Sequence, residues 1–372
     1  MHKLFKLSSN STPSSTSSVA SSSSEGHSAG SGGKGKSNNG SGNYPTTYSG
    51  QRIGVYLVGA TYLDTIMHVN HFPIEDTKQR AQMVEHRRGG NAANTAEVVG
   101  QDPKAKVWYM SSLPSVSASR MLLKELHANN IKTETCVYHP EQPSPPQAYI
   151  ISSVETGTRT IISHSTLPDL TLEEFVRKFD MEFVKFTSDL TSNKPPFTWI
   201  HFEGRGADAG RMIDYVERVY IKHGWRQKLT ISVEFEKGDR PGIQTLLQQA
   251  DVCFFSKLYA ETLGFHRPED FLDNIGKSCK PSATMFCCWG ARGAVALHLE
   301  SGTRFSAGAG RVEVIMDTVG AGDTFIAGII LALGVRGLDI GRGLKFACGL
   351  ASQKCTQYGF KSLLANLPPD MI

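Results

Sequence analysis

The residues best suited to chemistry lie in one stretch near the carboxyl end, where a glycine turn leads directly into an aspartate. The stretch reads Ile315-Met316-Asp317-Thr318-Val319-Gly320-Ala321-Gly322-Asp323-Thr324-Phe325-Ile326. We predict that it joins a strand to a helix through Gly320, Ala321 and Gly322. Such small residues let a phosphate lie against the backbone, where the free N–H groups of the first helical turn point at the anion.

Asp323 follows this turn at the place where the terminal phosphate of a bound triphosphate would arrive. A carboxylate repels that phosphate, so it is better explained as a general base that takes a proton from an attacking hydroxyl. The alternative, an Asp that caps a helix after a glycine turn, fits these residues equally well. The stretch alone therefore leaves phosphoryl transfer and simple capping open.

A second group of polar residues begins with Arg88-Gly89-Gly90-Asn91-Ala92-Ala93-Asn94. Two glycines open a predicted helix, and Asn91 and Asn94 are three residues apart, so both amides lie on one helical face. Each amide can donate and accept hydrogen bonds, which suits a polyol. A capping Asn followed by an unrelated surface Asn would explain the same residues without a ligand.

The elements that must position these residues follow from an alternation of apolar runs. Strand-like and helix-like runs alternate from residue 53 onward, which indicates an α/β fold around a mostly parallel sheet. Ligands bind beyond the carboxyl ends of the strands in such sheets. The predicted runs are 53–58, 92–99, 107–110, 121–126, 199–202, 212–220, 229–233, 252–255, 285–288 and 312–315.

Several regions depart from this alternation. Residues 1–49 are rich in Ser and Gly, and we predict a disordered tail before a single folded domain at 50–372. Residues 30–37 match the P-loop pattern letter for letter, but no strand or helix pattern flanks them, so we reject them as a nucleotide site. We predict that strands near 79–88 and 147–163 form a small β lid, and that the polar segment 180–196 is a surface insertion.

Composition narrows the function class. The chain has 372 residues, a formal net charge of +4 and no basic stripe with interleaved aromatic residues, so nucleic acid is not an expected partner. The longest apolar run, 325–335, is about half of what a bilayer requires, so we predict no membrane span. Seven cysteines without a C-x-x-C pair or a secretory signal suggest reduced thiols, no zinc site and a cytoplasmic location. The basic, Ser-rich start leaves a transit peptide open.

The two motifs together are similar to those of a known enzyme family. A Gly-Gly-Asn-Ala-x-Asn helix start, with Asp-Thr-x-Gly-Ala-Gly-Asp far later in the chain, resembles the two signatures of the ribokinase-like (PfkB) sugar kinases. Within that family the ketohexokinase branch is most similar, through segments 157–161, 199–205, 232–237, 254–257 and 346–355. The resemblance implies a three-layer α/β/α domain with a β lid. It also implies ATP-dependent phosphorylation of a ketose, above all D-fructose to fructose 1-phosphate, with ATP, Mg²⁺ and K⁺ as cofactors.

The resemblance implies roles for single residues. Gly320, Ala321 and Gly322 would form the anion hole, with Asp323 as base toward the sugar hydroxyl. Arg159 could equally be an ordinary arginine on a hairpin. Asp317 could equally be a structural cap or a contributor to the metal site. The implied sugar contacts are Asp64, Asp76, Gly90, Asn91, Asn94 and Arg159; the implied nucleotide contacts are Gly290, Gly293, Ala294, Lys257 and Cys355.

The metal site departs from the family pattern. Many members carry Asn-x-x-Glu after the strand at 252–255, whereas this chain has Ser256-Lys257-Leu258-Tyr259. Glu234, Glu236 and Glu261 are therefore candidates to orient a metal-bound water. The lid would expose an apolar face, which predicts a homodimer through the lid.

Two other functions fit the same motifs. A ribokinase, fructokinase or nucleoside kinase of this fold would share every phosphate residue and differ only in its sugar contacts. A catalytically weak metabolite-binding relative would have lost the anion hole or the base, and this chain retains both.

Overall fold

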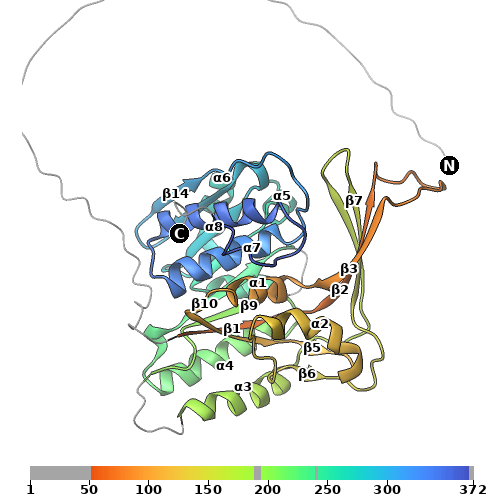
Figure 1. The fold of residues 1–372 in the computed structure, drawn as a ribbon. Coiled ribbons are helices and arrows are strands. Elements are labelled where there is room, and N and C mark those ends of the chain that lie inside the picture. Colours follow the sequence, from red (N-terminus) through yellow and green to blue (C-terminus); the bar gives the residue numbers. More distant parts are fainter. Residues whose placement is uncertain (1–51, 188–193, 239–241, 368–372) are drawn as a thin grey trace, which may run out of the picture. The chain divides into compact units, whose positions relative to one another are not determined.

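Buried parallel strands form the centre of the fold (Figure 1). The computed structural model describes residues 52–187, 194–238 and 242–367. Within these residues the main sheet has eight strands in the order β14-β13-β12-β11-β10-β9-β1-β4, antiparallel only from β12 to β14. Its strands are β1 (Ile53–Val58), β4 (Ala105–Met110), β9 (Trp199–Glu203), β10 (Thr230–Phe235), β11 (Val252–Phe255), β12 (Thr284–Cys288), β13 (Ala294–His298) and β14 (Thr303–Ala307).

Helices cover both faces of this sheet, because its parallel strands are apolar on both sides. In β1, Val55 and Leu57 belong to the core on one face, and Tyr56 and Val58 to the core on the other. The predicted three-layer α/β/α architecture is therefore confirmed. The first face carries α1 (Asn91–Val99), α2 (Val116–Ala128), α7 (Ala321–Ile329), its continuation η5 (Ile330–Val335) and α8 (Ile340–Lys354); the second carries α3 (Leu172–Thr187), α4 (Ala209–Lys222), α5 (Lys257–Thr262) and α6 (Pro268–Ile275).

A second sheet extends away from the main sheet as the lid (Figure 1). It has the order β3-β2-β7-β8 and consists of β2 (Tyr62–Val69), β3 (Met83–Gly89), β7 (Gln147–Ser153) and β8 (Arg159–His164). Strands β3, β7 and β8 lie where the sequence predicted lid strands, whereas β2 was missed. Its polar residues on one face, Asp64 and His68, hide the apolar alternation that would mark a strand.

The strand predicted at 312–315 is wrong. These residues form no strand, and Val314 and Ile315 are 67% and 63% exposed. An apolar run becomes a strand only where it pairs with another strand, and residues 312–315 pair with none of the described strands. The segment instead attaches to α8, where the Met316 N–H donates to the Cys355 carbonyl at 2.8 Å.

The surface insertion predicted at 180–196 begins too early in the chain to be correct as written. Residues 180–187 are the last turns of α3, and Phe183 in them is buried against Phe179, Tyr220 and Trp225. The polar residues between its apolar positions reflect an amphipathic helix, so their polarity was misread. Residues 188–193 lie outside the described part, as do the predicted tail 1–49 and the P-loop match at 30–37.

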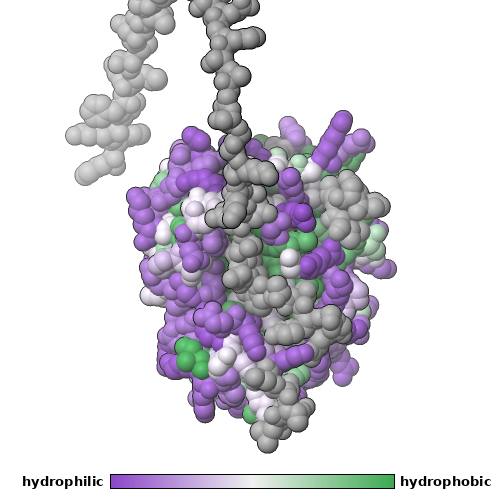
Figure 2. Space-filling view, turned by 90° about the vertical axis from the view of Figure 1, so that its left-hand side faces the viewer, coloured by the Kyte–Doolittle hydropathy of each residue, from purple (hydrophilic) through white to green (hydrophobic). Residues whose placement is uncertain are grey.

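The long apolar run at 325–335 is confirmed as a buried helix, since α7 and η5 contribute only buried residues there. Among the described residues, no helix is both long and apolar enough to cross a membrane. Hydrophilic side chains cover most of the face seen in Figure 2, which is the left-hand side of Figure 1. The apolar run thus belongs to the core between α8 and the main sheet.

The burial of Phe183 gives a test of the corrected helix. Phe183→Ala should lower the free energy of unfolding by about 3–5 kcal/mol, because it removes a large side chain from an aromatic cluster. Its neighbour Val184 is 58% exposed, so Val184→Ala should change the free energy by about 0.5 kcal/mol or less. Urea denaturation of both variants makes the comparison. Equal effects of the two substitutions would contradict the burial of this side of residues 180–187.

Candidate active site

The glycine turn before α7 is fixed by its backbone. Gly320 has φ of 84°, in the left-handed region that disfavours a side chain, and a Cβ there would lie 2.3 Å from the Phe360 ring. Its carbonyl accepts from the Thr324 N–H at 2.9 Å, so it starts the helix. A Cβ at Gly322 would meet no described atom within 4 Å. The first turn of α7 therefore presents its N–H groups beside open space, as an anion site requires.

Asp323 lies in this first turn and is buried, with 6% of its surface exposed. The Asn94 Nδ2 donates to its Oδ2 at 2.6 Å, and the Thr95 hydroxyl donates to its backbone carbonyl at 3.2 Å. Burial raises the pKa of Asp323 to about 7, with the charges of Glu236 and Glu203 adding to the rise and the Asn94 bond opposing it. A carboxyl with this pKa can exchange a proton near neutral pH, as a general base must.

Further carboxylates lie around Asp323 at the carboxyl ends of neighbouring strands. Glu234 is the penultimate residue of β10, and its Oε1 accepts from the Asn91 Nδ2 at 3.0 Å. Burial, with the charges of Asp323, Glu236 and Glu203, raises the pKa of Glu234 well above its usual range. Its Oε2 is buried and has no hydrogen-bond partner among the described residues. Asn91 and Asn94 thus face this acidic group from one side of α1, as their spacing predicted.

Asp64 is also buried, near the root of the lid. Burial raises its pKa to about 6, while the charges of Arg87 and Arg88 oppose the rise. A Cβ at Gly89 would lie 2.0 Å from the Asp64 Oδ1, so the glycine makes room for the carboxyl group. The structure therefore places Asp64 beside the start of α1, where the resemblance puts the sugar.

Asp317 is neutralised within the chain. Its Oδ2 accepts from Arg87 at 2.7 Å and from the Lys354 Nζ at 2.8 Å, and its Oδ1 accepts from the Val319 N–H at 2.9 Å. Burial would raise its pKa, but Arg87 and Lys354 outweigh burial and hold the pKa at about 2. Both oxygens are thus used inside the protein, which favours the structural reading of Asp317.

The lid contributes Arg159 to the site but leaves Asp76 at a distance. The Arg159 Nη1 donates to the Thr318 hydroxyl at 3.2 Å, so this arginine lies beside the glycine turn and also lowers the pKa of Asp323. Asp76 is exposed in the loop at the outer ends of β2 and β3, whereas Asp64 is at the inner end of β2. Within one chain the structure therefore does not bring Asp76 to Asp64.

The predicted nucleotide residues fall into two groups. Gly290 and Gly293 flank the turn η4 (Gly290–Arg292), and Ala294 begins β13; a Cβ at Gly293 would lie 2.0 Å from the Ala307 carbonyl oxygen. Lys257 joins this group, since its Nζ is 6.0 Å from the Trp289 ring centre and 3.3 Å from Glu261. Cys355 ends α8 and receives the Met316 N–H, so it lies beside the segment that leads into the glycine turn.

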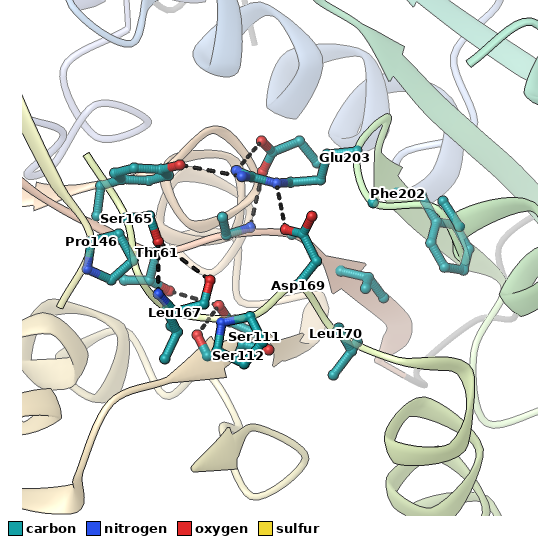
Figure 3. A pocket seen from close by; sticks show the side chains of 18 of the residues that line it. Thr61, Ser111, Ser112, Pro146, Ser165, Leu167, Asp169, Leu170, Phe202 and Glu203 are labelled. Carbon is teal, nitrogen blue, oxygen red and sulfur yellow. Dashed lines mark hydrogen bonds and ion pairs between the residues drawn. The ribbon is translucent and has the colours of Figure 1, made fainter. Parts of the chain in front are cut away.

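A small cavity of about 50 Å³ lies next to these groups, between β1, β4 and the segment after β8 (Figure 3). Thr61, Ser111, Ser112 and Asp169 line it, and so does Glu203, whose charge also raises the pKa of Asp323. Room for a few water molecules is too little for a sugar. Asp323 and Asn94 do not line this cavity.

Sequence reasoning missed four residues that complete the site: Arg87, Arg88, Glu203 and Lys354. Glu203 accepts from the Ala60 N–H at 3.0 Å and from the Arg205 Nη1 at 3.2 Å. A carboxylate at the end of an otherwise apolar strand could have signalled it. Arg87 and Lys354 carried no local signal, because their partner Asp317 is distant in sequence.

Comparison with known proteins fits this geometry. The sequence profile of the pfkB family carbohydrate kinases matches residues 54–366. Ketohexokinase of Mus musculus is 31% identical over 312 residues, which cover 83% of this chain and 98% of the relative. The chain therefore belongs to the pfkB family of carbohydrate kinases, which confirms the predicted enzyme class, an ATP-dependent carbohydrate kinase.

Solved structures show the same fold at low identity. Ribokinase from Giardia lamblia superposes with a TM-score of 0.68 at 17% identity, covering 84% of this chain and 96% of that one. Arabidopsis thaliana ribokinase complexed with ribose and ATP superposes with a TM-score of 0.62 at 16% identity, covering 85% and 98%. The ribokinase-like fold predicted from the sequence is thereby confirmed.

The raised pKa of Asp323 makes a prediction about stability. Its folded pKa exceeds the unfolded value, so the folded state holds the proton more tightly, and stability falls as pH rises from about 4 through 7. Asp323→Asn removes the titrating carboxyl group, so the variant does not lose this stability as pH rises. The variant should be more stable than the wild type by a few kcal/mol at pH 8, and the difference should shrink toward pH 4.

Urea denaturation at both pH values checks this expectation. Asp76→Asn is the matched control, because Asp76 is exposed and Asn tolerates its positive φ. The control should track the wild type at both pH values. A wild type more stable than Asp323→Asn at pH 8 would contradict the electrostatic account of the site.

Proposed function

We propose that this carbohydrate kinase transfers the terminal phosphoryl group of ATP to a hydroxyl of a ketose, above all D-fructose, to give fructose 1-phosphate. The contact between Asn94 and Asp323 at 2.6 Å, beside the open glycine turn, carries the proposal. It joins a sugar-binding amide to a carboxylate whose pKa of about 7 suits proton removal. Sugar and base then meet where the phosphate would lie.

In the proposed reaction Asp323 takes the proton of the attacking hydroxyl, and the hydroxyl oxygen displaces ADP from the terminal phosphorus in one step. The N–H groups at Gly320, Ala321 and Gly322 would stabilise the charge on the transferring group. No phosphoenzyme is needed. Asp64, Gly90, Asn91 and Asn94 would bind the sugar, with Arg159 closing over the phosphates from the lid.

ATP would extend from the glycine turn toward Gly290, Gly293, Ala294 and Lys257. Lys257 is half-exposed beside Trp289, so its charge is available to phosphates. Cys355 would contribute packing, since burial raises the pKa of its thiol and disfavours the thiolate. Asp76 would contact sugar only if a lid tip approached the site, by closure or from a second copy.

Magnesium fits the acidic residues in one respect. The buried Glu234 Oε2, which lacks a partner among the described residues, could accept from a metal-bound water, with Glu236 beside it. The described residues contain no group of three or more His, Cys, Asp or Glu arranged to hold a metal. Mg²⁺ would therefore be held chiefly by ATP oxygens and water, and when bound it would offset phosphate charge. Potassium stays a prediction without assigned residues.

The choice of fructose draws on the likeness to a relative named ketohexokinase. A ribose or nucleoside kinase remains the second candidate, because the ribokinase-like fold is shared. All seven cysteines carry free thiols, which supports the proposal of a reducing, cytoplasmic location.

An ATP-coupled assay over ketoses, aldoses and nucleosides tests the substrate. We expect fructose to give the highest kcat/KM, and kcat to fall as pH drops through about 7. Asp323→Asn should lower kcat by roughly 10²–10⁴ with little change in the KM for ATP. Asp270→Asn, at an exposed position of α6, should match the wild type. Faster turnover of ribose or a nucleoside would replace the ketose proposal.

We also propose a homodimer formed by the outer face of the lid. Strand register puts Asp64, Ile66, Ala148 and Ile150 on the inner face, where Ile66 and Ile150 pack with Val319. The alternate residues make the outer face. Its most exposed apolar residues are Val84 (51%), Tyr149 (40%) and Ile162 (59%), from three strands. A second copy of the same face is the simplest cover for an apolar sheet surface.

Sedimentation of a lid variant tests the dimer. Ile162→Lys puts a charge on the proposed interface, so it should convert a dimer to monomer at micromolar concentration while leaving the melting temperature of the chain nearly unchanged. Val184→Lys is the control, since Val184 is equally exposed but lies on α3. A wild type that sediments as a monomer would remove the proposal.

A further inference from the structure

The orientation of the Asn94 amide decides whether it helps or opposes Asp323. With Nδ2 toward Asp323, the amide donates a hydrogen bond to the carboxylate. Turned by half a rotation, it would present its carbonyl oxygen and repel the charge. Asparagine has no intrinsic preference between the two orientations, so a neighbour has to select one.

Arg88 supplies that selection. It is buried, with 5% of its surface exposed, at the root of β3. Its Nη1 donates to the Asn94 Oδ1 at 2.7 Å. An arginine carries donors and no acceptor, so only the carbonyl oxygen of the amide can face it. The amide nitrogen is then left on the side of Asp323.

The guanidinium itself is held in place from two sides. Its Nη2 forms an ion pair with Glu97, which lies three residues after Asn94 on α1 and is also buried. Its central carbon is 6.0 Å from the ring centre of Phe360, the residue that packs under Gly320. Arg88 therefore links the sugar-binding helix to the packing beneath the glycine turn.

We propose that Arg88 and Glu97 form a positioning pair for the reaction, which fixes the Asn94 amide so that it donates to Asp323. Neither residue touches the reacting atoms, and both act through Asn94. The inference rests on the proposed role of Asp323 as base. It adds the reason why Asn94 can bind sugar and support the base at the same time.

Other charged groups also face Asp323 and affect its ionisation, so a test has to take them into account. Glu203 on β9, Glu234 on β10 and Glu236 after β10 act against its ionisation, and Arg159 on β8 favours it. Arg88 additionally lowers the pKa of Asp64. Sugar affinity can therefore change through Asp64, so the decisive quantity is kcat at saturating sugar.

A mutant cycle separates positioning from general stability. Arg88→Met with Glu97→Met replaces the buried ion pair by apolar side chains of similar volume, which avoids an unpaired buried charge. We expect kcat to fall about tenfold or more, as for the loss of one hydrogen bond to a charged group. In an Asn94→Ala background the same pair of substitutions should change kcat by about twofold or less. Multiplicative losses in the two backgrounds would overturn the proposal.

A matched control and a direct probe complete the test. Asp102→Asn with Arg336→Met removes another ion pair, which is partly buried just beyond the C-terminal ends of α1 and η5, and should leave kcat unchanged. Should the double methionine variant not fold, Arg88→Gln with Glu97→Gln repeats the cycle, because a glutamine at 88 can accept as well as donate and so does not select the amide orientation. The Asn94 side-chain NH₂ resonances, assigned by Asn94→Ala, should exchange slowly with water in the wild type and quickly in the variant.

The NMR measurement needs no substrate, so it distinguishes two failures. If the wild type phosphorylates no sugar but its Asn94 resonances are protected from exchange, the proposed function is wrong. The proposal that Arg88 and Glu97 orient the Asn94 amide still holds in that case. Unchanged Asn94 resonances in the variant would end the positioning pair, whatever the enzyme phosphorylates.

Discussion

The burial of one carboxylate, Asp323, is the constraint around which the site is arranged. Asp323 cannot move toward water, because the residues that follow it in α7 and η5 are the apolar centre of the core. Gly320 fixes the preceding turn in a conformation that a side chain would strain. The carboxyl group therefore depends for its ionisation on the Asn94 hydrogen bond, the helix N-terminus and the charge of Arg159.

Charge compensation is divided unevenly across the site. Asp317 forms ion pairs with Arg87 and Lys354, whereas Glu234 and Asp323 form no ion pair with the described residues, and burial favours their protonated, neutral forms. A cationic or proton-bearing ligand is thus favoured at the carboxyl ends of β9 and β10. The neighbouring Asp317 carboxylate is already compensated by Arg87 and Lys354 and needs no such ligand. The part around Asp323 and Glu234 is therefore suited to bind a ligand, whereas the part around Asp317 attaches the lid to the glycine turn.

Local patterns predicted much of this arrangement, and long-range contacts account for what was missed. The glycine turn and the Asn91 and Asn94 spacing are read within a few residues, because helix geometry fixes what lies on one face. The ion pair of Arg87 with Asp317 joins residues 230 apart, and no local pattern signals it. The wrong strand at 312–315 has a similar origin, since an apolar run shows strand propensity but not whether a sheet edge is free to pair.

The lid shows why register matters more than composition here. Side chains alternate between the faces of a strand, so the same four strands carry Asp64, Arg87 and Arg159 inward and Val84, Tyr149 and Ile162 outward. A slip of one residue would exchange the charged face for the apolar one. The inner contacts of Arg87 with Asp317 and of Ile66 with Val319 hold the register. The residues that attach the lid to the glycine turn therefore also determine which surface the lid offers to a partner.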